Sequence, residues 1–295
     1  METALRIVGI ITPVLLIAAI GYVYGRLRKP DMSAINQLNV DLLTPLLVFS
    51  SMASKDFDLV RYLPLIACGL FVMLGSGLAG WLVARLLGYN PHAFIPPVVF
   101  TNTSNMGFPL TLFAFGADLL PAAVALFIVF SLGHFTVGIR IFDPKARLGG
   151  ILRGPMLWAM LAGLLMSLFG LALPPWLGIS ARMLGESAIP LGLFSLGVGF
   201  ASFHIDRWRI GLVGALLCPI AGLLVAWPLT RILPLSEPMQ GILLLYGALP
   251  PAVLNYVLAE KYRQEPALVA AIVVCGNIAS LVFVPLALYL ALPGR

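Results

Sequence analysis

The stretch PPVVFTNTSNMGFPLTLF at residues 96–113 places a run of hydrogen-bonding side chains, Thr101–Asn105, inside an otherwise apolar segment. Prolines flank this run on both sides. In hydrocarbon an unpaired backbone group is costly, so irregular backbone survives only where protein or a water-filled cavity surrounds it. We therefore expect a helix that is interrupted at this point, and the composition of the whole chain indicates that the setting is a membrane.

Hydrophobic residues make up 60% of the chain and charged residues only 10%, whereas a soluble domain carries about 25% charge. The mean hydropathy is +1.02. Charge-free windows long enough to span hydrocarbon, about 17 to 25 residues, occur at 7–25, 62–84, 86–117, 119–139, 154–181, 187–205, 210–230, 238–259 and 266–294. A tenth window, 33–54, is interrupted only by Asp41. We expect an all-α integral membrane protein of ten transmembrane helices, with no soluble domain at either end.

The basic residues predict the orientation. Arg26, Arg28 and Lys29 follow the first apolar run rather than preceding it, which is atypical of a secretory signal, so this run is expected to be a retained helix. Alternate loops carry 12 and 6 of the 18 Lys and Arg residues. The positive-inside rule then places the 143–153 loop in the cytoplasm and both termini outside a cell (inner) membrane. The basic net charge therefore requires no nucleic-acid partner.

The three cysteines, Cys68, Cys218 and Cys275, all fall inside expected spans, which argues against disulfides and metal sites. The three histidines are scattered and lack a nucleophile or a ligand cluster beside them. We expect no metal, no cofactor and no enzymatic activity.

The chain contains an internal repeat. PLLVFS at 45–50 recurs as PLGLFS at 190–195, and PAAVALFIVF at 121–130 recurs as PALVAAIVVC at 266–275. At an offset of 146, Trp81 and Arg85 correspond to Trp227 and Arg231. The expected units are residues 1–141 and 151–295, joined by a cytoplasmic linker at 142–150. Five helices is an odd number, so the second unit must enter the membrane inverted, as in many secondary transporters.

The fourth span and its repeat mate, the ninth, are both expected to break. The ninth reads ALPPAVLNYVLAEKY at 248–262, and proline is accepted at the start of a helix but not in its interior. Two half-helix N-termini with free N–H groups would then form an anion site without Lys or Arg. The expected substrate-binding residues are Asn102, Thr103, Ser104, Asn105, Pro250, Pro251 and Asn255. The alternative is that these polar side chains only hold neighbouring helices together.

Three further polar residues are candidates for coupling transport to protons or cations. Asp41 and Glu186 each precede a proline by four residues and are repeat equivalents at an offset of 145. Carboxyl groups inside a span are expensive and often functional. We expect Asp41 to lie deeper than Glu186, which lies four residues from Arg182 and could instead sit near the interface. His134 in the fifth span could relay a proton or simply make an interhelical hydrogen bond.

These motifs resemble those of the auxin efflux carrier family, which includes the plant PIN transporters and is more distantly similar to bile acid:sodium symporters. The most specific matches are NTSNMGFPL at 102–110 and ALPPAVLNYVLAEKY at 248–262. Less specific are GPMLWAMLAGLLMSLFGLALP at 154–174 and PLGLFSLGVGF at 190–200. The resemblance covers essentially the whole chain.

The resemblance implies a scaffold of helices 1, 2, 6 and 7, often the homodimer contact, and a transport domain of helices 3–5 and 8–10 in which helices 4 and 9 cross. It also implies that Asn102 and the segment from Pro250 to Asn255 line the substrate site. The long hydrophilic loop of the plant proteins is absent here. Asn255 stands where the plant proteins tend to have proline, and Ser104 and Asn105 stand where they are apolar, which favours a small or hydrophilic acid.

The sequence thus predicts a secondary transporter of small organic anions that works by alternating access. Coupling to H⁺, coupling to Na⁺ as in the bile acid transporters, and uniport all remain open. A ligand-sensing membrane receptor that uses the same pocket is a further alternative.

Overall fold

A computed structural model describes residues 2–54, 57–146, 149, 154–201 and 207–292. Part of the expected linker at 142–150 lies outside the described residues. Within the described residues every regular element is helical, and the only β-type pairing is an isolated bridge.

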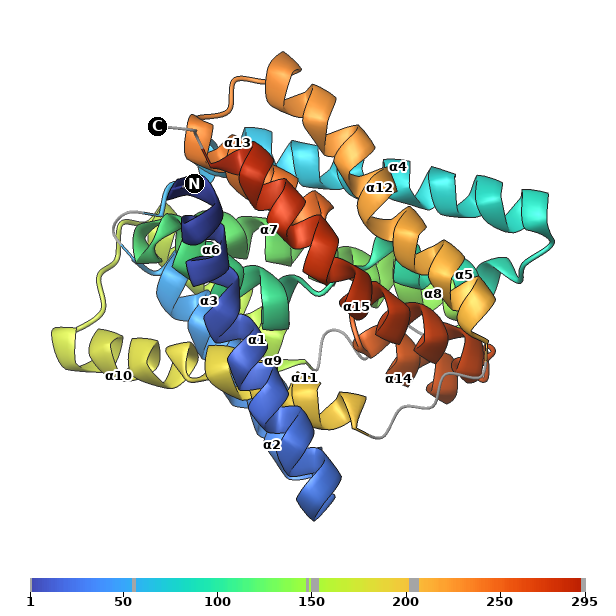
Figure 1. Cartoon of the computed structure of the whole chain (residues 1–295). Coiled ribbons are helices and arrows are strands. Elements are labelled where there is room, and N and C mark those ends of the chain that lie inside the picture. Colours follow the sequence, from blue (N-terminus) through green and yellow to red (C-terminus); the bar gives the residue numbers. More distant parts are fainter. Residues whose placement is uncertain (1, 55–56, 147–148, 150–153, 202–206, 293–295) are drawn as a thin grey trace.

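The helices follow one another along the chain with short connections (Figure 1). The elements of the N-terminal half are α1 (Glu2–Arg28), α2 (Ser33–Leu38), η1 (Asn39–Leu43), α3 (Thr44–Met52), α4 (Leu59–Leu87), α5 (Pro91–Val99), η2 (Thr103–Gly107), α6 (Phe108–Phe115), η3 (Ala117–Leu119), α7 (Leu120–Gly133), η4 (His134–Gly138) and α8 (Ile139–Phe142). Those of the C-terminal half are α9 (Pro155–Leu168), α10 (Pro175–Glu186), α11 (Ala188–Phe200), α12 (Trp208–Ile232), α13 (Glu237–Gly247), α14 (Leu254–Lys261) and α15 (Pro266–Ala291). Three of the short elements, η1, η2 and η4, are π-helical, and η3 is a 3₁₀ turn.

Local signals in the sequence set the helix ends. The carboxylate of Asp58 accepts hydrogen bonds from the first amides of α4, and Gly88, with φ of 69°, ends the same helix in the left-handed region. Asp31 accepts hydrogen bonds from the hydroxyl and the amide of Ser33 just before α2, and these bonds lower the pKa of the Asp31 carboxyl.

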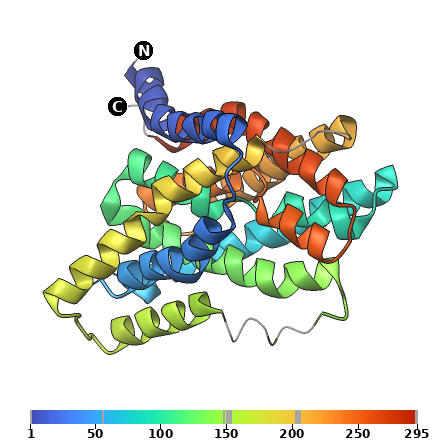
Figure 2. The same cartoon turned by 90° about the horizontal axis from the view of Figure 1, so that it is seen from below.

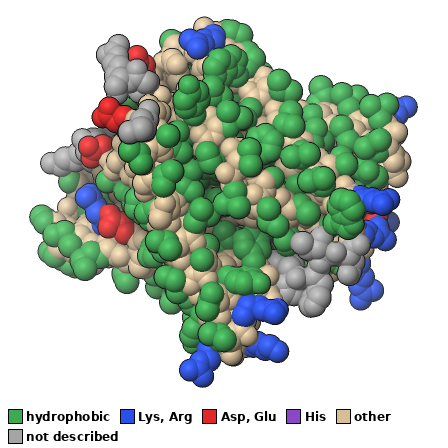
Figure 3. Space-filling view, in the orientation of Figure 1, with side chains coloured by type: hydrophobic (Ala, Val, Ile, Leu, Met, Phe, Trp, Pro, Cys, Tyr) green, Lys and Arg blue, Asp and Glu red, His purple; other side chains and the backbone are tan. Residues whose placement is uncertain are grey.

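Six helical segments of the described chain are long and apolar enough to cross a membrane. Large hydrophobic side chains also cover much of the outer surface (Figure 3). Contiguous exposed apolar surface on this scale is unusual for a soluble monomer. The fold is therefore consistent with an integral membrane protein.

One group of helices is held together by glycine. α1 packs along α11, where a Cβ at Gly21 would overlap the carbonyl of Phe194 and one at Gly197 would overlap the carbonyl of Ala18. α3 packs against α9 and α10, and Gly185 of α10 lies against the backbone of Leu47. Small residues that let backbones approach closely are the usual contacts between membrane helices.

The second group contains the elements from α4 to α8, including η2, and those from α12 to α15. α12 packs against both α4 and α15, and Gly222 of α12 meets the backbone of Gly247 at the end of α13. α1 and α6 also touch, as do α1 and α15, so the two groups share an interface. The start of α1 and the end of α15 lie at the same end of the molecule in both views (Figures 1 and 2).

The expected spans at 154–181 and 187–205 have the wrong boundary. α9 ends at Leu168, Gly170 adopts a φ of 61°, and a new helix begins at Pro175 and continues through α11 to Phe200. Gly170 turns the chain just after α9, and Pro174 and Pro175 stand at the start of α10, whereas the hydrophobicity of the sequence is uniform across this turn. Glu186 consequently lies near the middle of a 26-residue helical segment and not near its start.

Candidate functional site

Two helices break and touch each other at their breaks. α5 ends at Val99 and η2 begins at Thr103, while α13 ends at Gly247 and α14 begins at Leu254. Thr101 and Pro251 form an isolated antiparallel bridge. The Asn102 amide donates to the Pro250 carbonyl at 2.8 Å, and the Ala252 amide donates to the Phe100 carbonyl at 3.0 Å. Each break thus supplies hydrogen-bond partners that the other has lost.

The pair of bonds follows a local two-fold symmetry. Exchanging residue 100 with 250, and 102 with 252, turns one of the two hydrogen bonds into the other. On this register Asn105 and Asn255 are equivalent, each four residues beyond the bridged residue. The two proline pairs are not equivalent on this register: Pro96 and Pro97 lie within α5, before the break, whereas Pro250 and Pro251 form the break itself.

Asn255, in the first turn of α14, makes hydrogen bonds that hold the two breaks together. Its side chain is completely buried, and its Nδ2 donates to the carbonyls of Phe100 at 2.8 Å and Ala252 at 3.0 Å. Its Oδ1 is buried without a hydrogen-bond partner among the described residues. The side chain lies close to the ring of His134, which stacks on Phe100 with centroids 4.4 Å apart. The Asn255 Nδ2 therefore has a structural role, while its Oδ1 accepts no hydrogen bond among the described residues.

Asn105 faces a different neighbour. A Cβ placed on Gly192 of α11 would lie 2.6 Å from the Asn105 Oδ1 and 3.5 Å from the Asn39 Nδ2. Asn39 is buried in η1 and accepts a hydrogen bond from the Thr44 hydroxyl at 3.2 Å. Because α11 and η1 belong to the first group of helices and η2 to the second, these amides lie at the interface between the groups.

The π-helical turns coincide with the sequence-predicted residues. Asp41 lies in η1, Thr103, Ser104 and Asn105 lie in η2, and His134 begins η4. A π turn widens the helix by one residue, costs hydrogen-bond quality, and is frequent at functional sites. The three π turns of the described chain thus contain Asp41, the segment Thr103–Asn105 and His134.

Unpartnered polar atoms gather near the crossing. Among the described residues, the buried side-chain atoms without a hydrogen-bond partner include Thr101 Oγ1, Asn102 Nδ2, His134 Nε2, Asn255 Oδ1 and Asn277 Oδ1. Such atoms are rare in folded proteins, because each loses its hydration without compensation. The side chains of His134 and Asn255 lie close enough to pair with each other, so Thr101, Asn102 and Asn277 hold the atoms that a polar ligand would pair with.

The backbone offers donors at both breaks. Among the described residues, the N–H groups of Ser104 and Asn105 have no acceptor, and neither do those of Val253 and Leu254. These amides stand at the N-terminal ends of η2 and α14, where the helix dipole favours negative charge. Ser104 and Asn105 are partly exposed residues. The arrangement suits a carboxylate.

The two carboxyl groups lie elsewhere. Asp41 and Glu186 are both exposed on the single chain, so neither is buried by the protein itself. Glu186 ends α10, which begins at Pro175, and Asp41 lies in η1. Among the described residues no three His, Cys, Asp or Glu side chains gather in a way that could hold a metal ion.

Three residues of this region were not predicted from the sequence as part of the site. Asn277 of α15 donates to the Pro251 carbonyl at 3.3 Å, Gly192 makes room for Asn105, and the Tyr246 hydroxyl lies 3.5 Å from the Thr103 carbonyl. The only available signal was Asn277, a lone amide within the apolar run at 266–294, because polar groups inside a span are costly.

Comparisons with known proteins agree on the type of protein. A sequence family described as membrane transport protein matches residues 6–148 and again 145–288. An uncharacterized transporter of Methanothermobacter thermautotrophicus is 27% identical, over 92% of this chain and 94% of the relative. An uncharacterized transporter of Methanocaldococcus jannaschii is 23% identical, over 92% of this chain and 95% of the relative. The resemblance to the auxin efflux carrier family is confirmed by the family match.

Proposed function

Because the chain belongs to the membrane transport protein family, we propose that it is a secondary transporter of small organic anions whose substrate binds where the two interrupted helices cross. The observation that carries the proposal is the pair of breaks with free amides, Ser104 and Asn105 on one side and Val253 and Leu254 on the other. Free amides at helix N-termini bind carboxylates without a buried cation. The membrane expected to hold this transporter is the cell (inner) membrane, with both termini outside.

The proposed topology has ten spans. Helices that continue into one another, such as α2–η1–α3 and α10–α11, count as one span each, and so do the two broken helices. The double match of the family, at 6–148 and 145–288, supports two five-helix halves near 1–141 and 151–295. The local two-fold symmetry of the crossing supports their inverted relation.

The proposed mechanism assigns the two helix groups different roles. Helices 1, 2, 6 and 7 form the scaffold, which is also the expected homodimer contact, and helices 3–5 and 8–10 carry the substrate. Asn102, Thr103, Ser104, Asn105, Pro250, Pro251 and Asn255 form the binding site on the moving group. Asn39 and Gly192 complete this site from the scaffold in the present conformation, since both lie beside Asn105. Movement of one group against the other would expose the site on alternate sides.

The substrate site is tested by replacing Asn102 with Ala. The Asn102 Nδ2 makes no hydrogen bond among the described residues, so its loss should change the melting temperature little. A charge-assisted hydrogen bond to a carboxylate is worth enough that its loss should weaken binding about ten- to a hundredfold. Purified protein is screened by thermal shift against mono-, di- and hydroxycarboxylic acids, and the hits are then measured as uptake into proteoliposomes. Failure of every carboxylate to bind, or wild-type uptake by Asn102→Ala, would contradict the proposal.

Coupling is proposed to involve Asp41, with Glu186 as its repeat equivalent. If Asp41 carries a proton, Asp41→Asn should abolish the dependence of uptake on an imposed pH gradient, because the amide cannot be protonated in this range. Uptake is measured in proteoliposomes at fixed membrane potential, with and without sodium, and Glu186→Gln serves as the matched variant. A gradient response retained in Asp41→Asn removes this residue from the mechanism.

A further inference from the structure

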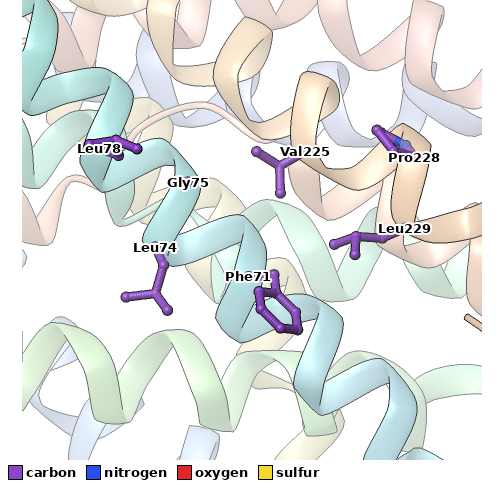
Figure 4. A pocket seen from close by; sticks show the side chains of 7 residues that line it. All are labelled: Phe71, Leu74, Gly75, Leu78, Val225, Pro228 and Leu229. Carbon is purple, nitrogen blue, oxygen red and sulfur yellow. The ribbon is translucent and has the colours of Figure 1, made fainter. Parts of the chain in front are cut away.

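An open apolar groove runs between α4 and α12, away from the crossing (Figure 4). It has a volume of about 420 Å³. Its lining consists of Phe71, Leu74, Gly75 and Leu78 from α4 and Val225, Pro228 and Leu229 from α12. The surrounding surface over these two helices is hydrophobic (Figure 3), and the side chains of Phe71, Leu74 and Leu78 are mostly exposed.

Gly75 determines where the helices meet. A Cβ at this position would collide with the side chain of Val225, so glycine allows α4 and α12 to touch at this point. The groove opens between the two helices beside this contact (Figure 4). Gly75 is also near the middle of α4, 14 residues from Arg61 and 10 from Arg85. In a protein that spans a membrane, the groove therefore lies near mid-depth and faces lipid.

The same face of α4 leads from the groove to a cation. At about 100° per residue, Phe71, Leu74, Leu78, Trp81 and Arg85 form one continuous stripe, because they are spaced by three or four residues. The Arg85 guanidinium lies over the Trp81 ring, 5.4 Å from its centroid. No carboxylate among the described residues lies within ion-pair distance of Arg85. The Arg85 guanidinium can therefore pair with an anion that does not belong to the chain.

We propose that this stripe is a phospholipid-binding site, in which one acyl chain occupies the groove and the phosphate pairs with Arg85 beside Trp81. Ten residues of helix separate Arg85 from Gly75, a rise of about 15 Å. This length equals about half of the roughly 30 Å hydrocarbon core, which is the depth that one leaflet's acyl chain reaches. Tryptophan prefers the level of the lipid headgroups, and basic side chains near that level attract anionic lipids.

The internal repeat supplies a matched control. Arg231 stacks on Trp227 at the same 5.4 Å distance and is the repeat equivalent of Arg85. On α12, however, the three lining residues Val225, Pro228 and Leu229 share a mean direction from which Trp227 points about 150° away and Arg231 about 110° away, by the same helical geometry. Arg231 thus has the same chemistry as Arg85 and lacks the adjoining groove.

The test is native mass spectrometry of delipidated full-length protein titrated with 1-palmitoyl-2-oleoyl phosphatidylglycerol. Arg85→Gln should weaken the first lipid-binding step about fivefold, the usual contribution of one basic side chain near a membrane surface. Arg231→Gln should leave this step unchanged. Leu74→Trp should abolish it by filling the groove, whereas Leu224→Trp, on the outer face of α12, should not. Leu74 is 65% exposed and Leu224 70% exposed, so neither substitution disturbs the core.

The proposal would be overturned if Arg85→Gln and Arg231→Gln weakened the first lipid-binding step equally. It would also be overturned if Leu74→Trp bound the first lipid as tightly as the wild type. If Leu74→Trp instead converts a dimer to a monomer and leaves lipid binding unchanged, the groove is occupied by a second copy of the chain, which also overturns it. Melting temperatures of all four variants should equal that of the wild type, which confirms that each is folded.

Discussion

The variant Asn255→Ala is expected to lose both thermal stability and substrate transport, whereas Asn105→Ala should lose transport alone. The Asn255 amide donates to two carbonyls at the crossing, and its side chain is completely buried. Removing a buried hydrogen-bond partner costs about 1–3 kcal/mol. Asn105 is only partly buried, and its amide group donates to no acceptor in the described chain. The two residues are equivalent by the local symmetry, so the comparison isolates the role of their surroundings.

Both variants are measured by melting temperature in detergent and by proteoliposome uptake of a carboxylate identified in the thermal-shift screen. We expect a melting temperature several degrees lower for Asn255→Ala and unchanged for Asn105→Ala. Equal melting temperatures would show that the Asn255 hydrogen bonds do not stabilise the crossing. Normal uptake by both variants would remove both amides from the substrate site.

The second large effect is expected for Gly197→Ala at the contact between α1 and α11. A Cβ at residue 197 would overlap the carbonyl oxygen of Ala18, and the neighbouring atoms are backbone that cannot rotate away. Overpacking of this kind costs about 1–3 kcal/mol or more. The melting temperature should therefore fall by several degrees, and the protein should elute more heterogeneously in size-exclusion chromatography.

Gly199→Ala is the matched control for this experiment. It lies two residues further along α11, and a Cβ there would meet no atom within 4 Å. Alanine is favoured over glycine within a helix by up to about 1 kcal/mol, so this variant should be as stable as the wild type or slightly more stable. If Gly197→Ala were equally stable, α1 and α11 would not be packed as closely as the structure places them.

Much of the crossing could be predicted from local sequence. The run Thr101–Asn105 and the pair Pro250-Pro251 are signals that act within one helix, and both breaks occur where these signals stand. The boundary between α9 and α10 was predicted wrongly, because hydrophobicity is uniform across it and only Gly170 and two prolines mark the turn. Apolar composition reports on membrane residence more clearly than on where a helix ends.

The different surroundings of Asn105 and Asn255 could not be predicted. Both are amides just beyond a break, and only the packing of other helices sends one toward Gly192 and the other toward Phe100. Gly192 is likewise one glycine among 29, and its importance depends on a neighbour 87 residues away in sequence. Tertiary contacts of this kind carry no local signature.

The reciprocal bonds between Asn102 and Pro250, and between Ala252 and Phe100, make the two halves of the chain energetically dependent on each other. Either half alone in a bilayer would expose a bare amide and a bare carbonyl to hydrocarbon, where no water can replace the missing partner. In the proposed arrangement of two five-helix units, we therefore expect that neither unit folds stably without the other.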